Sequence, residues 1–301
     1  MPERYPALAA LAPYLRCPVC SGRVRPGPGG SGPGGSGPGG HGAEQVSCER
    51  GHGFNIARQG YVSLVGGRGG PGTGDSAEMV MARTRFLGGG HYQPVAAAVA
   101  GLAARLDPGG PGLALDLAGG TGYYLAAVLD ALAPDRTGAC VDLSAPALRR
   151  AARAHPRAAA LGADAWRPLP LADGSAAVVL SVFGPRNAAE IRRVLVPGGG
   201  LVIAAPGPGH LAELRAALGL IGIDARKGER LAGAFGGFAP AGEAVVRYEL
   251  RLGPADLTDL VAMGPNARHV GPADLAARVA ALPAPFAVTV DVTVRGLSIS
   301  Q

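Results

Sequence analysis

The sequence contains no uninterrupted apolar run of about eighteen residues, although 48% of its 301 residues are hydrophobic. A helix that spans a membrane needs a run of that length, so we expect no membrane-spanning segment. Residues 1–5 show no positively charged stretch followed by an apolar core, so we also expect no signal peptide. Together these absences favour a cytoplasmic protein that does not bind a membrane.

Cysteine is scarce, with four residues in the chain, too few for a disulfide scaffold at this length. Cys17 and Cys20 form a Cys-x-x-Cys pair, and Cys48 lies four positions before His52. Two such pairs can place three sulfur atoms and one imidazole nitrogen around a metal ion. We predict one structural zinc ion per chain at these four residues; a redox-active thiol pair is the alternative. Cys140 lies in an apolar run and is expected to be a buried hydrophobic residue.

Lysine is nearly absent: Lys227 is the only lysine among 28 basic residues, and the net charge is +6. Residues 1–70 hold seven arginines against three acidic residues, so positive charge is concentrated around the predicted zinc site. Arginine side chains pair with phosphate groups and stack on bases. A compositional bias would explain arginine in place of lysine, but it explains the concentration less well. The distribution favours a polyanionic partner.

A segment of glycine, proline and serine with one histidine, residues 26–42, separates the two halves of the predicted zinc site. It contains no side chain able to build a core, so we expect a flexible insertion. Around it we expect a zinc-binding RNA-recognition domain over residues 1–62. A connector with helical segments would occupy residues 63–110, and residues 111–301 would form the cofactor-binding domain.

From residue 113 onward, short apolar runs alternate with stretches of helical periodicity. The runs predict strands at 113–117, 138–142, 158–163, 176–182, 200–205, 243–252 and 286–294. Helices are predicted at 76–87, 94–105, 123–132, 145–154, 188–195, 210–219, 254–262 and 272–281. Apolar strands alternating with helices indicate a parallel sheet covered on both faces, whereas the last two strands alternate like antiparallel edge strands. This α/β arrangement, a Rossmann-like fold with a seven-stranded mixed sheet, is typical of class I S-adenosylmethionine-dependent methyltransferases.

The glycine-rich segment Asp116-Leu-Ala-Gly-Gly-Thr-Gly122 joins the first of these strands to the following helix. Glycines let a ligand approach the backbone, and the helix N-terminus offers unpaired N–H groups. The turn alone is also compatible with a nicotinamide cofactor. Acidic residues at the ends of the first three strands favour S-adenosylmethionine, with Asp142 suited to the ribose hydroxyls and Asp164 to the adenine amine. The candidate cofactor contacts are Asp116, Gly120, Thr121, Gly122, Asp142 and Asp164.

The segment after the fourth strand, residues 181–187, would form the floor of the acceptor pocket. It lacks the Asn/Asp-Pro-Pro-Tyr/Phe pattern that supports methylation of exocyclic amino groups. This absence weakly favours a ring nitrogen, carbon or oxygen as the acceptor. The sequence does not identify the catalytic residues or a general base; Phe183 and Arg186 are the pocket-floor candidates, suited to stacking on and orienting the acceptor.

With these residues assembled, the chain resembles the RlmA family of large-subunit rRNA guanine-N1 methyltransferases. The similarity covers nearly the whole chain and points to the actinobacterial branch that includes tylosin and mycinamicin resistance enzymes. It rests on the two metal-binding pairs, the glycine-rich turn and several strings specific to the family. These strings are Gly74-Asp-Ser-Ala-Glu-Met79, Gly90-His-Tyr-Gln-Pro94, Gln59-Gly-Tyr-Val-Ser-Leu64, Val196-Pro-Gly-Gly199 and Pro206-Gly-Pro-x-His-Leu211.

The resemblance implies cofactor contacts at Tyr92, Gly120, Thr121 and His210, and zinc ligation by the cysteines and histidine named above. It further implies a homodimer whose substrate is a guanine in a hairpin loop of 23S rRNA near the peptide exit tunnel. A methyl group there would confer resistance to tylosin- or mycinamicin-type macrolides. The family's turn usually reads Gly-Cys-Gly-Glu-Gly; this chain differs from it at residues 118, 119 and 121, which keeps the shape but can change the affinity.

Two other functions are compatible with the sequence. A small-molecule methyltransferase whose zinc lobe has no part in substrate binding would act on metabolites and show no salt-sensitive RNA binding. A non-catalytic zinc-ribbon protein with a relict cofactor fold would bind no cofactor. The intact acidic and glycine positions of the turn argue against this last function.

Overall fold

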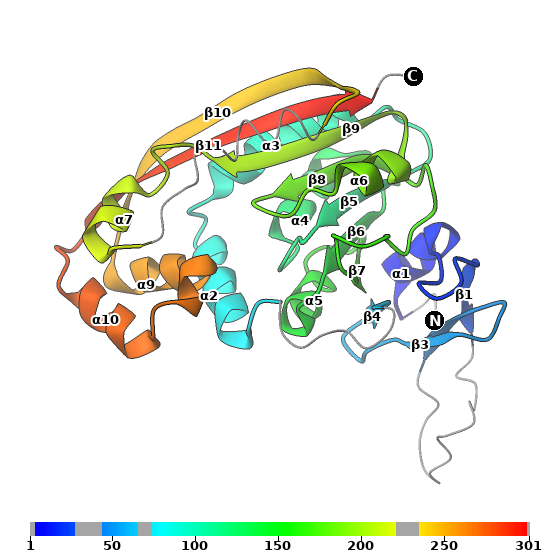
Figure 1. Ribbon diagram of the computed structural model, residues 1–301, viewed down its shortest axis with the longest axis horizontal. Helices are drawn as coiled ribbons and strands as arrows, with labels where there is room; N and C mark the ends of the chain where they lie inside the picture. Colours follow the sequence, from blue (N-terminus) through cyan, green and yellow to red (C-terminus); the bar gives the residue numbers. More distant parts are fainter. Residues whose placement is uncertain (1–3, 28–43, 66–73, 221–234, 300–301) are drawn as a thin grey trace, which may run out of the picture.

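The apolar runs of the sequence form the strands of two sheets (Figure 1). The computed structural model describes residues 4–27, 44–65, 74–220 and 235–299, so most of the glycine-rich insertion falls outside the described residues. The strands are β1 (Val24–Gly27), β2 (Gln45–Cys48), β3 (Gly53–Asn55), β4 (Tyr61–Ser63), β5 (Leu113–Leu117), β6 (Gly138–Asp142), β7 (Ala158–Gly162), β8 (Ala176–Val182), β9 (Leu195–Pro206), β10 (Phe238–Leu252) and β11 (Phe286–Ile299).

Most of the helices begin where the sequence offers a side-chain cap or a proline. The Ser76 hydroxyl accepts the backbone N–H of Met79 at the start of α2, and Asn187 caps α6 in the same way through Glu190. Among the described residues, no helix is long and apolar enough to cross a membrane. The helical elements are α1 (Pro6–Leu11), η1 (Ala12–Tyr14), α2 (Ala77–Gly88), α3 (Gln93–Leu106), α4 (Tyr123–Ala131), α5 (Ala145–Ala151), α6 (Ala188–Val194), α7 (Ala212–Leu218), α9 (Pro254–Ala262), η2 (Pro265–Arg268) and α10 (Pro272–Ala280).

The large sheet has the strand order β10-β11-β9-β8-β5-β6-β7-β4. From β9 to β4 neighbouring strands are parallel, and β11 and β10 are added antiparallel to β9, as the sequence predicts. The predicted count of seven strands is wrong, because the large sheet has eight. The extra strand is β4, which pairs its residues Tyr61 to Ser63 with β7 and covers an edge that would otherwise expose unpaired backbone groups.

Helices cover both faces of this sheet and enclose two apolar cores. Alternate residues of a strand point to opposite faces, so Ala114 belongs to one core whereas Leu113 and Leu115 belong to the other. Helices α3, α4 and α5 cover the first face, and α1 and α6 cover the second. The fold class is therefore the predicted class I methyltransferase arrangement, and the carboxyl ends of β5, β6 and β8 meet at one edge of the sheet.

The N-terminal lobe consists of α1, η1 and the antiparallel sheet β1-β2-β3, and it lies at one end of the molecule (Figure 1). Its buried residues, such as Leu8 and Val46, belong to the same apolar core as Leu115 in the central strand. An antiparallel bridge between Leu15 and Leu171 ties the lobe to the segment that follows β7. The lobe is thus packed against the cofactor-binding fold instead of hanging from a linker.

The strands β9 and β11 extend well beyond the lengths that the sequence predicts. Gly200 and Gly296 lie where the end of α3 crosses the sheet, and a Cβ atom at either position would lie within 2.8 Å of Leu106. Glycine therefore lets the helix pack directly on the strands. The long β10–β11 ribbon leads to α9 and α10, which with α2 close the side of the fold away from the N-terminal lobe (Figure 1).

Candidate cofactor and metal sites

The turn between β5 and α4 is shaped by three glycines. Gly120 and Gly122 have φ values of +57° and +78°, a region that residues with a Cβ atom rarely adopt. A Cβ atom on Gly119 would lie 2.6 Å from the carboxylate of Asp116 and 2.8 Å from Sγ of Cys140. The backbone can therefore fold back over the end of β5 only when these positions lack side chains.

Asp116 lies under this turn with a relative exposure of 1%, and neither of its carboxylate oxygens has a hydrogen-bond partner among the described residues. Burial, and after it the nearby charge of Asp142, raises the pKa of Asp116 to about 8. A buried acid without a partner is costly, so this position is suited to a group that donates to it or neutralises its charge. The amino group of S-adenosylmethionine has that chemistry.

Asp142 at the end of β6 is tied to both adjoining loops. Its Oδ2 accepts the N–H of Gly120 at 2.9 Å, and its Oδ1 accepts the N–H of Ser144 at 2.8 Å. Burial raises the pKa of this carboxyl, while the two N–H donors act to lower it. The structure thus brings Asp142 and Asp116 to the same turn, where a carboxylate at the second strand end can also accept from ribose hydroxyls.

The third predicted acidic residue, Asp164, follows β7. Its Oδ1 accepts the N–H of Trp166 at 2.9 Å, which orders the loop and leaves the indole ring 65% exposed. Asn187 in turn donates to the carbonyl of Trp166, so the loop after β7 is joined to the loop after β8. Asp164 lies at the same sheet edge as Asp116 and Asp142, and its hydrogen-bond and ion-pair partners, Trp166 and Arg167, lie in its own loop.

Tyr92 and His210 come together although they are 118 residues apart, with 3.3 Å between the phenol oxygen and Nε2. Burial lowers the pKa of His210 to about 4, so the ring is neutral at pH 7. Its Nδ1 accepts the backbone N–H of Asp291 at 3.2 Å, which places the ring proton on Nε2. A neutral His210 can therefore donate to Tyr92, and it has no free nitrogen with which to accept a proton.

Phe183 lies against these rings at the end of β8. Its ring is stacked on His210 with 6.1 Å between centroids, and it lies 6.3 Å from Tyr92 and 6.4 Å from Tyr124. Phe183 has a positive φ of +54° and remains 40% exposed, so a strained backbone holds an aromatic face toward solvent. Such a face can stack on a planar base.

Arg186 forms no hydrogen bond and no cation–π contact with this aromatic group among the described residues. Its Nε is buried without a partner, and burial together with the charge of Arg295 lowers its pKa. The loop that carries it is closed by a hydrogen bond from the Ser181 hydroxyl to the carbonyl of Pro185. Of the two predicted floor residues, the structure therefore brings only Phe183 to Tyr92 and His210.

Arg83 was not among the sequence candidates, yet its guanidinium lies beside the glycine turn. Its Nη1 would be 3.0 Å from a Cβ atom on Gly120. The same group pairs with Asp75 at 2.5 Å and donates to the carbonyl of Met263 at 2.7 Å. These partners are eight and 180 residues away in the sequence, and Arg83 lies outside the family-specific strings, so no motif singled it out.

The four predicted metal ligands form one cluster, with all ligand atoms within 4.8 Å of one another. Each pair lies on a tight turn closed by backbone hydrogen bonds, from Ser21 to Cys17 and from Gly51 to Cys48. Burial raises the pKa of Cys17. At Cys48 burial also acts to raise the pKa, but N–H groups of His52 and Arg50 outweigh it and lower the value to about 6. The cluster has the donor set and the spacing to hold a metal ion.

Comparisons with known proteins agree with this geometry. A family model described as "Methyltransferase domain" matches residues 114–199. The "Putative 23S rRNA (guanine-N(1)-)-methyltransferase" of Micromonospora griseorubida is 46% identical and the "23S rRNA (guanine(748)-N(1))-methyltransferase" of Streptomyces fradiae is 44% identical. In each case 93% of this chain and 95% of the relative are covered. A solved "putative methyltransferase" from Bacillus halodurans has 16% identity and a TM-score of 0.47, covering 67% of this chain and 99% of that one.

The methyltransferase domain supports S-adenosylmethionine as the cofactor of the glycine turn. Nicotinamide, the competing cofactor for such a turn, finds no support in these relatives. The orphaned carboxyl of Asp116 fits a ligand that carries an amino group close to the turn.

Replacing Asp116 with asparagine is expected to stabilise the cofactor-free protein, and more at pH 8 than at pH 5. The pKa of this carboxyl is about 8 in the folded protein and about 4 in the unfolded chain. Its contribution to stability is therefore complete below about pH 4 and is lost as the pH rises through about 8. Each pKa unit is worth about 1.4 kcal/mol, and about 1 kcal/mol shifts the Tm of such a domain by about 2–4 °C. Thermal unfolding at both pH values would measure this difference.

Asp142→Asn is the matched control, because that side chain accepts two hydrogen bonds and its replacement should lower the Tm.

The same Asp116→Asn protein should bind S-adenosylhomocysteine at least about tenfold more weakly, because a charge-assisted contact is lost. Equal Tm changes at pH 5 and pH 8 would contradict the assignment of a buried, titrating carboxyl.

Proposed function

Because the chain belongs to the family of 23S rRNA guanine-N1 methyltransferases, we propose that it methylates N1 of a guanine in a hairpin loop of 23S rRNA. The methyl donor in this proposal is S-adenosylmethionine. The name of the Streptomyces fradiae relative specifies guanine 748, and the corresponding loop guanine is the proposed target. Resistance to tylosin- or mycinamicin-type macrolides is the proposed physiological consequence.

One observation carries this proposal: the identity to two rRNA methyltransferases extends over 93% of the chain. An alignment of that extent spans much of the N-terminal lobe as well as the cofactor-binding fold. A small-molecule methyltransferase would need only the second of these. The family resemblance also supports a homodimer whose two N-terminal lobes border the RNA, and we include it in the proposal.

The chemistry assigns distinct tasks to the residues of the site. S-adenosylmethionine supplies an electrophilic methyl group. Asp116, Asp142 and the N–H groups of the glycine turn would hold the cofactor, with Thr121 and Tyr92 beside it. The exposed ring of Phe183 would stack on the guanine, which a hairpin loop allows to leave the stack at low cost. Guanine N1 carries a proton at neutral pH, so methylation at N1 also releases that proton.

We propose that zinc occupies the cysteine–histidine cluster. With bonds of about 2.3 Å to sulfur and about 2.0 Å to nitrogen, tetrahedral zinc separates its sulfur ligands by about 3.8 Å and sulfur from nitrogen by about 3.5 Å. The observed separations are 3.7 Å between Cys20 Sγ and Cys48 Sγ and 3.3–3.6 Å from the sulfurs of Cys48 and Cys17 to Nδ1 of His52. Four protein ligands leave no open position, as in structural zinc sites.

Replacing Cys48 with serine should therefore lower the zinc content from about one ion per chain to well below half an ion. RNA methylation should fall, because the lobe that carries β1, β2 and β3 loses its central ligand set. Cofactor binding should persist, since the glycine turn lies in the other domain. Elemental analysis and calorimetry with S-adenosylhomocysteine would measure the two effects. Cys140→Ala is the control that should retain zinc, and unchanged zinc in Cys48→Ser would refute the assignment.

We further propose that Arg83 pairs with the carboxylate of the methionine part of the cofactor. A guanidinium forms paired hydrogen bonds with carboxylates, and that of Arg83 lies at the turn and is 24% exposed. Its existing ion pair with Asp75 holds it there before the cofactor binds. Arg83 would thus bind the amino-acid end of the ligand, whereas Asp142 would bind its ribose.

Two ligands test this role, because 5′-methylthioadenosine lacks the amino-acid part of S-adenosylhomocysteine. Arg83→Gln should bind S-adenosylhomocysteine about tenfold more weakly, a loss of about 1.4 kcal/mol, with little change for 5′-methylthioadenosine. Arg85→Gln is the matched control on the same helix, since that side chain pairs with Asp259 and not with the turn. Equal weakening of both ligands in Arg83→Gln would mean that Arg83 acts only through structure.

The reaction itself predicts one methyl group on N1 of the loop guanine in unmodified 23S rRNA. N1 methylation blocks the pairing edge of the base, so primer extension should stop one nucleotide before it. Replacing the target guanine with adenine should abolish the stop. Expression in a sensitive host should also raise tolerance to tylosin- or mycinamicin-like drugs. A methyl group on adenine or ribose, or activity confined to metabolites, would overturn the proposal.

A further inference from the structure

A groove of about 850 Å³ lies between α2 and α5, beside the cofactor turn. Helices α2 and α5 form its two sides (Figure 1), and the segment before β4 contributes Arg58 and Gln59. Thr121 and Tyr123, at the end of the glycine turn and the start of α4, form part of its floor. The groove thus connects the N-terminal lobe with the place where the methyl donor is expected.

Positive charge dominates the lining of this groove. It carries four arginines, and no acidic side chain lines it within the described part of the chain. All four arginines are exposed, and none forms an ion pair with a described residue. They are Arg58, Arg149, Arg150 and Arg153.

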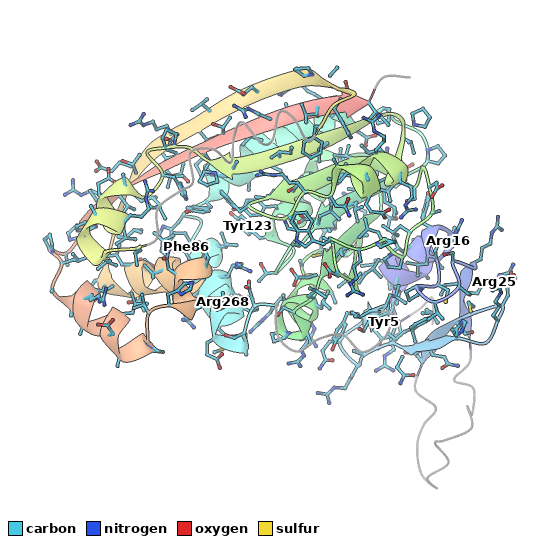
Figure 2. All side chains as sticks on the ribbon, in the orientation of Figure 1. Tyr5, Arg16, Arg25, Phe86, Tyr123 and Arg268 are labelled. Atoms are coloured by element: carbon cyan, nitrogen blue, oxygen red, sulfur yellow. The ribbon has the colours of Figure 1, made fainter. Side chains whose placement is uncertain are left out.

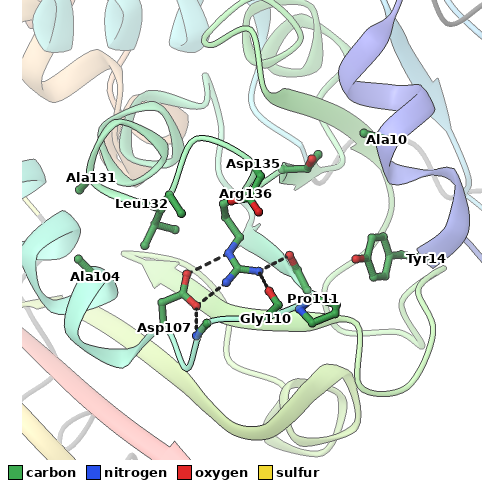
Figure 3. A pocket seen from close by; sticks show the side chains of 14 residues that line it. Ala10, Tyr14, Ala104, Asp107, Gly110, Pro111, Ala131, Leu132, Asp135 and Arg136 are labelled. Atoms are coloured by element: carbon green, nitrogen blue, oxygen red, sulfur yellow. Dashed lines mark hydrogen bonds and ion pairs between the residues drawn. The ribbon is translucent and has the colours of Figure 1, made fainter.

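Another cavity, lined by residues that include Asp107 and Arg136, shows the opposite arrangement (Figure 3). It lies at the amino ends of β5 and β6. Its arginine, Arg136, forms hydrogen bonds with groups inside the fold. The Arg136 guanidinium forms a paired interaction with Asp107 and donates to the carbonyls of Gly110 and Gly112. The charge of Arg136 is therefore neutralised by Asp107 within the fold, whereas none of the groove arginines pairs with a described acidic residue.

Helix stability explains only part of this charge. Arg149 and Arg150 lie in the last turn of α5, where cations favour the helix dipole by about 0.3–1 kcal/mol. That account does not extend to Arg153, which follows the helix, or to Arg58, which comes from another segment. Four like charges on one groove repel one another, so the arrangement is best stabilised by an external polyanion.

The remaining lining is suited to nucleotides. On the α2 side Met81 is exposed and the lining residues Val80 and Leu87 are buried, while the ring of Tyr123 is half-buried at the floor. Proteins that hold single-stranded nucleic acid combine a positive groove with such surfaces, because phosphates pair with arginine and bases or riboses pack on rings and methyl groups. An acidic protein partner would use the charge but would have no need of the floor.

We infer that this groove binds the sugar–phosphate backbone of the substrate RNA adjoining the target guanine. The inference rests on the proposed function and specifies where the RNA runs: from the N-terminal lobe, past α5, to the cofactor turn. The outer arginines of the N-terminal lobe, such as Arg16 and Arg25 (Figure 2), belong to the lobe itself and line no part of the groove.

The test compares two double variants that lose equal charge. Arg149→Gln/Arg153→Gln removes two groove arginines, and Arg105→Gln/Arg251→Gln removes two exposed arginines of α3 and β10 outside the groove. The probe is an in vitro transcript of the hairpin that contains the target guanine, with binding measured by fluorescence anisotropy from low to high salt. Calorimetry with S-adenosylhomocysteine and thermal unfolding provide the controls for the cofactor site and the fold.

We expect the groove variant to bind the hairpin about ten- to a hundredfold more weakly at low salt. The slope of log affinity against log salt should become shallower by about 1.5, because each phosphate contact contributes about 0.7–0.9. The control variant should keep the wild-type affinity and slope. Binding of S-adenosylhomocysteine should be unchanged in both variants.

An unchanged salt slope in the groove variant would overturn the inference, as would equal losses in the two variants. If the inference fails in this way but the wild-type protein methylates the hairpin, the proposed function remains intact. A wild-type protein that binds the hairpin with the predicted slope but transfers no methyl group would overturn the proposed function instead. Loss of binding to an acidic peptide, with RNA binding retained, would reassign the groove to a protein partner.

Discussion

The backbone of the turn between β5 and α4 can approach Asp116 only because Gly119 has no side chain, and the rest of the site depends on that approach. It brings the N–H of Gly120 to the Asp142 carboxylate and so fixes the ends of two strands to each other. It also buries Asp116 without a partner, which raises the pKa to about 8 and leaves free energy to be recovered when a cationic ligand binds. The same buried carboxyl therefore destabilises the empty turn and, in the proposed function, contributes to cofactor binding.

Much of this could be predicted from the sequence, for reasons that are local. Apolar runs bounded by glycine or aspartate gave β5, β6 and β8 to the residue, because buried strands exclude polar side chains throughout. The eighth strand, β4, could not be predicted, since three residues with Ser63 at their end carry no pattern and their pairing with β7 is decided by tertiary contacts. The acidic residues at the strand ends could also be predicted, because each one marks the point where an apolar run stops. Arg83 and the backbone support of His210 by Asp291 were missed because their partners are 180 and 81 residues away.

The charge distribution shows a similar division. The sequence indicated an excess of arginine in residues 1–70, and composition could say nothing about how those charges meet others in space. In the folded chain Arg4 lies near Glu44 and Arg25 near Glu49, so part of that excess is balanced at the surface. Arg58, by contrast, joins three arginines that lie about ninety residues later in the chain, on and after α5. The unbalanced positive charge is thus a property of the fold, and it lies beside the turn instead of being confined to the zinc lobe.

Helix α2 connects the groove with the cofactor turn, because its two faces carry different residues. Positions 77, 80, 81, 84 and 88 recur at the helical period and line the groove. Arg83 lies on another side, where it joins the turn, Asp75 and the end of α9, and Arg85 ties the helix to Asp259. A ligand at the turn that changed the position of Arg83 would act on the same rigid helix that forms one side of the groove. Because one rigid helix contacts both sites, cofactor binding and RNA binding can influence each other through α2.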